Sequence, residues 1–350
     1  MEPNISPSKA TIVTEKQLTS SYLNHEVPKI WGNFVVYMVY LNDTGYPNDY
    51  ILNLTSLKER PLNSSKNWQE IGDISDKYVV WQENHGTSDL NIYDISTGKN
   101  SRIKTSGSYS SSPSISGNLI AYLGRVNDHD EVFYYDISTS TETQITISDS
   151  VHVSPKIYGD VIAYSAINPN ARLSDVYVYN VTTRVTTRLT YDGSSGTLQV
   201  YDGKVLYGVY DKNNNDELFL RDLSTNQTIK VDSKMSSHGG VCFYGDLIVY
   251  VGYNGSNSGL YTYSISSTKE SLLTDRAAVN PAIYENRIVW QGSRNGCDEI
   301  YMAEFFTVKP VTHPSEPINL GLAVVVMLIV SAVMVILLWN ARKQMRARHS

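Results

Sequence analysis

The sequence predicts an all-β protein: a seven-bladed β-propeller closed by an N-terminal strand, followed by one C-terminal transmembrane helix. Three observations lead to this prediction. A turn dipeptide followed by β-branched residues and an aromatic recurs seven times within the 350 residues. An alternating second segment follows each copy, and one long apolar run without charges stands near the C-terminus. Repeats of this kind are typical of a ring of blades, and such a run is typical of a membrane span.

The aromatic residue that ends each copy marks the repeat. Successive aromatics are 44, 41, 42, 43, 43 and 40 residues apart. A turn followed by β-branched residues and an aromatic indicates a turn that enters a strand. Four short strands in about 42 residues make one propeller blade, so the spacing predicts seven blades. The marker aromatics are Tyr37, Trp81, Tyr122, Tyr164, Tyr207, Tyr250 and Trp290.

Each repeat contains the other three strands of a blade. In the third repeat an alternating segment at residues 132–137 leads into a Ser/Thr-rich turn, and residues 144–146 form a further strand. A short segment before each copy of the signature, such as residues 155–158, supplies the innermost strand. Aspartate at the turn, here Asp136, is expected to cap the turn backbone.

The N-terminal segment has the pattern of a repeat that lacks its beginning. Thr19 lies 18 residues before Tyr37, just as Thr146 lies 18 residues before Tyr164. We therefore predict that the N-terminal strand completes the seventh blade, because a propeller must protect its open edges. The alternative is that residues 308–312 close that blade, although the prolines around them interrupt a strand ladder.

The apolar run predicts how the chain is anchored. Residues 318–339 hold 22 residues without a charge, which is enough to cross a bilayer, and four bases follow in residues 340–350. Basic flanks stay in the cytoplasm, so we expect a single-pass protein of the cell membrane with the propeller outside. The expected parts are an N-terminal segment (1–9), the propeller (10–306), a short stalk (307–317), the transmembrane helix (318–339) and a basic cytoplasmic tail (340–350).

The N-terminus does not match this topology, because it shows no basic region followed by an apolar stretch. Either a signal peptide has been removed or omitted, or the chain is tail-anchored from the cytosol. Asn-x-Ser/Thr sequons agree with an exported chain. The glycosylation candidates are Asn42, Asn53, Asn63, Asn180, Asn226 and Asn254, and a seventh sequon begins at Asn4.

The repeats resemble those of TolB-like β-propellers over about residues 10–306. The repeats are most similar to those of archaeal surface-layer and cell-surface proteins. The similarity lies in the motifs Gly-Asp-x-Ile-Val-Tyr and Asp-Ile-Ser-Thr-Gly, and above all in residues 288–302. Where soluble TolB-like blades often begin with Ser-Pro-Asp-Gly, this chain has Ile-x-Gly-Asn/Asp, which favours the archaeal subgroup. The resemblance implies the fold, whereas related propellers serve as binding platforms, peptidase gates and lyase scaffolds. The tail also resembles those cut by archaeal sortase-like enzymes, but it lacks their Pro-Gly-Phe motif.

No catalytic constellation is evident in the sequence. A propeller peptidase is not expected, because only 44 residues follow Phe306 and a hydrolase domain does not fit there. A metal-assisted lyase needs several converging histidines and acids, and the seven histidines form no HxH or HxxxH pair. His25, His152 and His238 precede innermost strands and could reach one rim of the channel; the alternative for each is a solvated loop histidine.

One loop resembles the start of a calcium site. Asp211, Asn213 and Asn215 place oxygen side chains at alternate positions, as hard cations require. The loop lacks the central glycine and the twelfth-position glutamate of such a site, and an ordinary hydrated hairpin is the alternative. Calcium is thus the one cofactor that the sequence suggests.

Three other groups of residues are candidates for a structural or functional role. Acids recur at equivalent hairpin positions, which indicates a structural role; they are Asp89, Glu131, Asp175, Glu217 and Glu299. Cys242 and Cys297 could lie on one rim, and whether they pair stays open. Loop aromatics that could stack on sugars are Tyr46, Trp68 and Tyr109.

Taken as a sequence, the chain is expected to be a non-enzymatic binding or structural module for cell-surface proteins or envelope polysaccharide. The alternatives are a metal-assisted polysaccharide lyase or hydrolase that uses the propeller channel, and a tail-anchored cytosolic scaffold. A net charge of −6, which includes the four bases of the tail, argues against nucleic-acid partners because acidic surfaces repel phosphates.

Overall fold

Seven four-stranded antiparallel sheets make up the part of the chain that the computed structural model describes. The described residues are 10–41, 45–63, 65–84, 86–170, 173–213, 215–255, 257–294 and 296–307. Residues Thr11–Phe306 form one compact unit. The predicted transmembrane helix, the basic tail and the sequons at Asn4 and Asn42 lie outside the described residues. Within those residues there is no helix that is both long enough and apolar enough to cross a membrane.

In six of the seven sheets the strands follow one another in sequence from the innermost to the outermost, and in blade seven the outermost strand is β1. Blade one is β2 (His25–Trp31), β3 (Phe34–Tyr40), β4 (Pro47–Asn53) and β5 (Lys58–Pro61); blade two is β6 (Trp68–Ile74), β7 (Tyr78–Asn84), β8 (Ser88–Asp94) and β9 (Lys99–Ile103). Blade three is β10 (Ser110–Ser116), β11 (Leu119–Val126), β12 (His129–Asp136) and β13 (Thr141–Gln144); blade four is β14 (Val151–Tyr158), β15 (Val161–Asn168), β16 (Leu173–Asn180) and β17 (Val185–Arg188). Blade five is β18 (Ser195–Tyr201), β19 (Lys204–Tyr210), β20 (Asp216–Asp222) and β21 (Thr228–Lys230); blade six is β22 (Ser237–Tyr244), β23 (Leu247–Asn254), β24 (Asn257–Ser264) and β25 (Lys269–Thr274). Blade seven is β26 (Val279–Tyr284), β27 (Arg287–Arg294) and β28 (Cys297–Thr307), with β1 (Ala10–Gln17) as its outermost strand.

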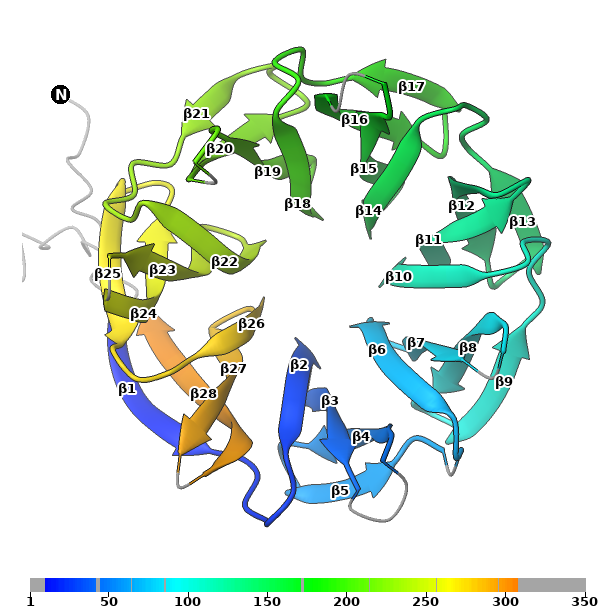
Figure 1. The fold of residues 1–350 in the computed structure, drawn as a ribbon. Helices are drawn as coiled ribbons and strands as arrows, with labels where there is room; N and C mark the ends of the chain where they lie inside the picture. Colours follow the sequence, from blue (N-terminus) through cyan, green and yellow to red (C-terminus); the bar gives the residue numbers. More distant parts are fainter. Residues whose placement is uncertain are drawn as a thin grey trace, which may run out of the picture. The chain divides into compact units, whose positions relative to one another are not determined.

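The order of strands in blade seven confirms the predicted closure. The sheet runs β1-β28-β27-β26, so the first strand of the chain pairs with the last. Just beyond β1, the amide of Leu18 donates a 2.7 Å hydrogen bond to the carbonyl of Ile300. Figure 1 shows β1 beside β28, and the innermost strands of all seven blades surround one axis. The closure covers an edge of β28 that would otherwise be unpaired.

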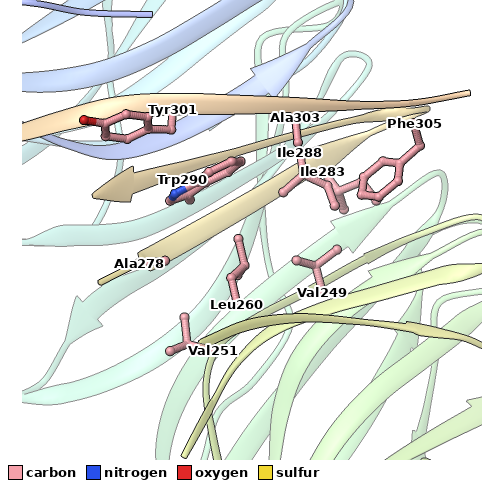
Figure 2. Packing of buried hydrophobic residues seen from close by; sticks show 10 residues of the cluster. All are labelled: Val249, Val251, Leu260, Ala278, Ile283, Ile288, Trp290, Tyr301, Ala303 and Phe305. Atoms are coloured by element: carbon pink, nitrogen blue, oxygen red, sulfur yellow. The ribbon is translucent and has the colours of Figure 1, made fainter. Parts of the chain in front are cut away.

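The repeat signature forms the second strand of each blade, and its aromatic packs in the core. Tyr37 and Trp81 are 0% and 1% exposed. The apolar cores lie between successive blades. Figure 2 shows one of them, in which Val249 and Leu260 of blade six face Ile288 of blade seven. Because each sheet buries both faces against its neighbours, the strands carry apolar residues on both faces.

A bulge interrupts the innermost strand of every blade. In five blades the bulge contains a residue with positive φ. The pairing register between the first and second strands shifts at each of these bulges. These residues are Val27, Ser112, Ser154, Gly240 and Asn280, with φ between 50° and 53°. Four of them precede proline, which cannot donate to the ladder and is tolerated at such bulges. Two of these residues donate their backbone amide to a glutamine of the preceding blade. The amide of Ser112 donates to Gln82 Oε1 at 3.0 Å, and the amide of Val27 donates to Gln291 Oε1 at 3.2 Å.

Candidate functional site

The residue that follows each bulge forms a belt around the ring axis, which we call the axial belt. Each member occupies the same register position, opposite the residue before the marker aromatic of its blade. The axial belt consists of Lys29, Asp73, Ser114, Lys156, Gln199, Cys242 and Ala282. Their side chains are only partly accessible or buried. Two lysines and one aspartate are therefore the charged residues of this belt.

The charged members of the belt are coupled electrostatically across the ring. The pKa of Lys156 is lowered, first by burial and then by the positive charge of Lys29, whereas Asp73 raises it. These residues belong to blades four, one and two, so Lys156 does not share a blade interface with either of the others. Blades that are not neighbours approach each other only at the axis. The pKa of the Cys242 thiol in blade six is raised to about 12 by burial, with Lys29 again acting in opposition.

The acid of the belt is engaged in hydrogen bonds, whereas the lysines are not. Asp73 Oδ2 accepts from Ser114 Oγ at 3.0 Å and from the amide of Ile115 at 3.2 Å, and its Oδ1 accepts from the amide of Ile74 at 2.9 Å. It thus ties blade two to blade three. No described side chain forms a hydrogen bond or ion pair with the ammonium group of Lys29 or Lys156.

Five aromatic rings form an arc at the end of the axis where the innermost strands finish. We call this arc the aromatic crescent; in order it is Trp31, Tyr284, Tyr244, Tyr201 and Tyr158. Successive ring centroids are 4.8, 5.3, 4.5 and 4.5 Å apart, within the range of favourable aromatic pairs. All five side chains are half-buried. The crescent passes through blades one, seven, six, five and four, and serines occupy the matching positions of blades two and three.

The two lysines mark the two ends of the crescent. Lys29 lies two residues before Trp31 on β2, and Lys156 lies two residues before Tyr158 on β14. Residues two apart in a strand share a face and are roughly 7 Å apart along it. Each terminal aromatic therefore has a lysine on the same face of its strand, two residues earlier.

The other end of the axis is acidic. Glu26 lies three residues before Lys29 on β2. In the neighbouring blades, Gln82 Nε2 donates to Glu70 at 3.0 Å and Gln291 Nε2 donates to Asp298 at 3.0 Å. The pKa of Glu70 is raised by burial, with Lys29 lowering it. The two ends of the axis thus differ in chemistry, one being aromatic and the other carboxylic.

The three inner-strand histidines lie between blades, in contrast to both readings of the sequence. Their side chains are 2–5% exposed, so they are not solvated. Nor do they converge, because each faces an acid of the preceding blade: His25 Nδ1 is 3.0 Å from Glu299, His152 Nδ1 is 3.3 Å from Glu131, and His238 Nδ1 is 3.3 Å from Asp216. Among the described residues there is no group of three or more His, Cys, Asp or Glu that could hold a metal ion.

Four of the five recurring acids are buried, as expected for the structural role in each hairpin that the repeat predicts. Asp89, Glu131, Asp175 and Glu299 are 4–8% exposed. Glu217 differs: its side chain is 57% exposed and pairs with Lys230 at 2.6 Å. The preceding residue, Asp216, is buried instead and faces His238. The prediction is therefore wrong for Glu217, because the buried acid of blade five is one residue earlier.

The predicted calcium loop is a hairpin whose carboxylate binds the loop itself. Asp211 Oδ1 accepts from the amides of Asn213 and Asn215 at 2.7 and 2.9 Å, and Asn215 Nδ2 donates to Asp211 Oδ2 at 3.1 Å. These bonds lower the pKa of Asp211. Calcium binding here stays a prediction, as the described atoms show the hairpin alone.

The remaining candidates are spread over the surface and the axis. Cys242 and Cys297 are both free thiols. Tyr46 is 48% exposed, whereas Trp68 and Tyr109 are half-buried.

The described sequons differ in how their asparagines are held. Asn226 and Asn254 are exposed. Asn180 Nδ2 donates to Asp160 at 2.9 Å, Asn53 Oδ1 accepts from the amide of Thr55, and Asn63 Oδ1 accepts from Gln69.

A pocket of about 270 Å³ lies away from the axis, where the ring closes. Lys16, Asn33, Arg287 and Glu304 are among its lining residues. Arg287 donates to Asn33 at 3.2 Å and so bridges blade seven to blade one. The pocket thus lies at the junction where blade seven meets blade one.

The crescent was not predicted from the sequence, although the sequence contains a pattern that marks its residues. An aromatic stands immediately before the signature turn in five of the repeats, as in Trp31-Gly32 and Tyr158-Gly159. Such aromatics are also expected in the packing between blades. That they contact one another in a continuous arc depends on the ring and could not be deduced from one repeat.

Comparison with known proteins identifies the fold. No family model and no curated protein matches the chain. Among solved structures, an oligogalacturonate lyase in complex with manganese has a TM-score of 0.65 at 14% identity and covers 86% of this chain and 97% of its own. The β-propeller domain of the Trilobed protease from Pyrococcus furiosus has a TM-score of 0.64 at 11% identity, covering 85% and 99%. TolB from Acinetobacter baumannii has a TM-score of 0.51 at 14% identity, covering 80% and 78%. The chain thus has a TolB-like propeller fold, and identities this low carry no function.

Proposed function

We propose that this protein is a cell-surface binding module that holds a polysaccharide chain against the aromatic crescent and has no enzymatic activity of its own. The crescent is the observation that carries the proposal. One face of a sugar ring consists largely of C–H groups, which pack on an aromatic face while the hydroxyls stay in water. The five rings form a continuous arc and each keeps part of its surface accessible for such contacts.

Each ring of the crescent packs against the edge of a core between two blades but is not fully buried there. The marker aromatics already fill the space between blades, and Tyr37, Tyr122 and Tyr250 are 0% exposed. The crescent rings lie beyond them, at the ends of the innermost strands, and keep part of their surface accessible. Aromatic side chains with an apolar body and an accessible polar tip are frequent at binding sites.

The surface location rests on the sequence beyond the described residues. The apolar run at residues 318–339 and its basic flank favour a single-pass anchor with the propeller outside. Sequons at exposed Asn226 and Asn254 agree with an exported chain. The similarity of the repeats to archaeal surface proteins supports the same placement. Cell-surface proteins are the other partners that such a ring could bind.

Binding of neutral oligosaccharides tests the proposal. The full-length chain, purified in mild detergent, is titrated with cello-, xylo- and manno-oligosaccharides by calorimetry. Tyr201→Leu and Tyr244→Leu should each weaken binding about tenfold, since each removes a stacking face worth roughly 1.4 kcal/mol. Tyr22→Leu is the matched control, because Tyr22 is 96% exposed and lies outside the crescent.

Thermal unfolding of each variant separates a lost site from a lost fold. Variants that unfold at the wild-type temperature but no longer bind support the proposal. Wild-type affinity in both crescent variants would refute it, as would failure of the wild type to bind any oligosaccharide, neutral or acidic. Cleavage of an added polysaccharide that stops with a chelator would instead favour the metal-assisted lyase, whose fold this ring shares.

A further inference from the structure

The lysines of the axial belt point to the charge of the ligand. We propose that the crescent takes an acidic polysaccharide, and that Lys29 and Lys156 bind the carboxylate groups of its uronic acid residues. This inference rests on the proposed function and specifies its substrate class. It is carried by the positions of the two lysines, by the absence of partners for them among the described residues, and by the charge of the surrounding protein.

Two unpaired lysines at one axis require an explanation. Bringing like charges together in a partly desolvated place is unfavourable, and proteins normally supply a counter-charge. The acids coupled to the two lysines are already engaged: the oxygens of Asp73 accept three hydrogen bonds from blades two and three, and Glu70 accepts from Gln82. Burial and the charge of Lys29 lower the pKa of Lys156, and Asp73 opposes them only in part. A bound anion would relieve both costs.

The chain as a whole makes these positive charges unusual. It has 35 acidic and 29 basic residues, so its average surface repels anions. The far end of the axis carries Glu26 and Glu70, with the axial belt between them and the crescent. An anionic ligand would therefore be held from the crescent end and not from the acidic end.

The spacing of lysine and aromatic suits a sugar acid. In a uronic acid the carboxylate is attached to the same ring whose C–H face stacks. Lys29 and Trp31 share one face of β2 and are roughly 7 Å apart along it, as are Lys156 and Tyr158 on β14. Between these ends the belt offers uncharged Gln199, Cys242 and Ala282. Both ends of the crescent thus combine a stacking face with a cation.

A matched pair of ligands tests the inference. The full-length chain is titrated with an oligomer of β-1,4-linked glucuronic acid and with its carboxyl-reduced form, which is the neutral glucose oligomer of the same linkage. We expect the acidic oligomer to bind about tenfold more tightly, since two charge-assisted contacts are added. The preference should shrink as salt rises, because exposed charges are screened.

Substitutions assign the preference to the two lysines. The double variant Lys29→Gln with Lys156→Gln should bind both oligomers equally, and Lys156→Arg should keep the preference. Lys104→Gln is the control, because Lys104 is exposed and lies outside the belt. Thermal unfolding confirms that each variant folds, and the neutral oligomer serves as an internal probe of the crescent.

The outcomes separate the two proposals. Equal binding of both oligomers by the wild type overturns the uronate inference and leaves the polysaccharide module standing. A preference that survives in the double variant also overturns it, because other groups then carry the charge recognition. Failure of both oligomers to bind counts against the proposed function and, with it, against this inference.

Discussion

Thr19 donates a 2.5 Å hydrogen bond from Oγ1 to Glu299 Oε2, across 280 residues of sequence. The same carboxylate accepts the amide of Ser21 at 2.9 Å and lies 3.0 Å from Nδ1 of His25. One acid of the last blade therefore holds three residues of the N-terminal segment. The junction that closes the ring is made by these side chains as well as by β1.

The same arrangement occurs once more inside the ring. Glu131 Oε2 accepts from Thr146 at 2.5 Å, Glu131 Oε1 accepts from the amide of Ser148 at 3.0 Å, and His152 Nδ1 lies 3.3 Å from Glu131. The residues bound to Glu131 have the sequence spacing of those bound to Glu299. Closure thus repeats a junction that the continuous chain uses between blades three and four.

Replacing the carboxylate at the closure should destabilise the ring. We expect Glu299→Gln to lower the free energy of unfolding by about 1–3 kcal/mol, because buried donors lose a charged acceptor. Glu217→Gln is the control, since Glu217 has the equivalent hairpin position but is exposed, and it should change stability by less than about 0.5 kcal/mol. Urea unfolding measures both. Equal effects of the two variants would contradict the structural role of Glu299.

Asp49 should be the least favourable buried group of the ring. It is 0% exposed, and neither carboxylate oxygen has a hydrogen-bond partner in the described part of the chain. Its pKa is raised well above the usual range by burial, then by Glu70 and Glu83. Other blades have an apolar residue at the same register position, such as Val132. We therefore expect Asp49→Leu to raise the free energy of unfolding by about 1–3 kcal/mol at pH 7.

The pH dependence of that gain provides a second check. Because the native pKa of Asp49 is raised, the native state keeps a proton that the unfolded state loses above about pH 4. Wild-type stability should fall as pH rises from that point towards the native pKa, and Asp49→Leu should lack this fall. Asp76→Asn, at an exposed position, is the control and should follow the wild-type profile. A difference between Asp49→Leu and wild type that stays constant with pH would contradict the assignment.

Most of the fold could be predicted because it is encoded locally and repeatedly. The seven marker aromatics from Tyr37 to Trp290 gave the number of blades, and the match of Thr19 with Thr146 indicated the closure. Each depends on a pattern within one repeat or on a comparison of two. Glu217 was misplaced because blade five has an acid at each of two successive positions, and sequence alone does not show which one turns inward.

The candidate site could not be predicted because it depends on contacts between blades. Lys29 and Lys156 are 127 positions apart and belong to blades that share no interface. Their proximity follows from the geometry of the ring and not from any motif. The histidines illustrate the same limit: His25 was expected before an innermost strand but is the first residue of β2, and its direction towards Glu299 depends on how neighbouring sheets pack.

Cys242 should resist alkylation in the folded protein. Burial raises its pKa to about 12, so the reactive thiolate is scarce at pH 8. In a Cys297→Ser variant, Cys242 is the sole thiol of the chain. We expect iodoacetamide to label that variant in urea but hardly at all in native buffer, as read by mass spectrometry. Rapid native labelling would show that Cys242 is accessible from the axis.

Protease treatment of intact native cells should reveal on which side of the membrane the ring lies. With an epitope after Ser350, we expect the propeller to disappear while a tagged, membrane-protected fragment remains, because the basic flank favours a cytoplasmic C-terminus. A cytosolic marker that survives treatment is the control for cell integrity. Complete protection that ends on lysis would instead place the ring in the cytosol as a tail-anchored scaffold. In that case the ligands of the crescent would have to be sought inside the cell.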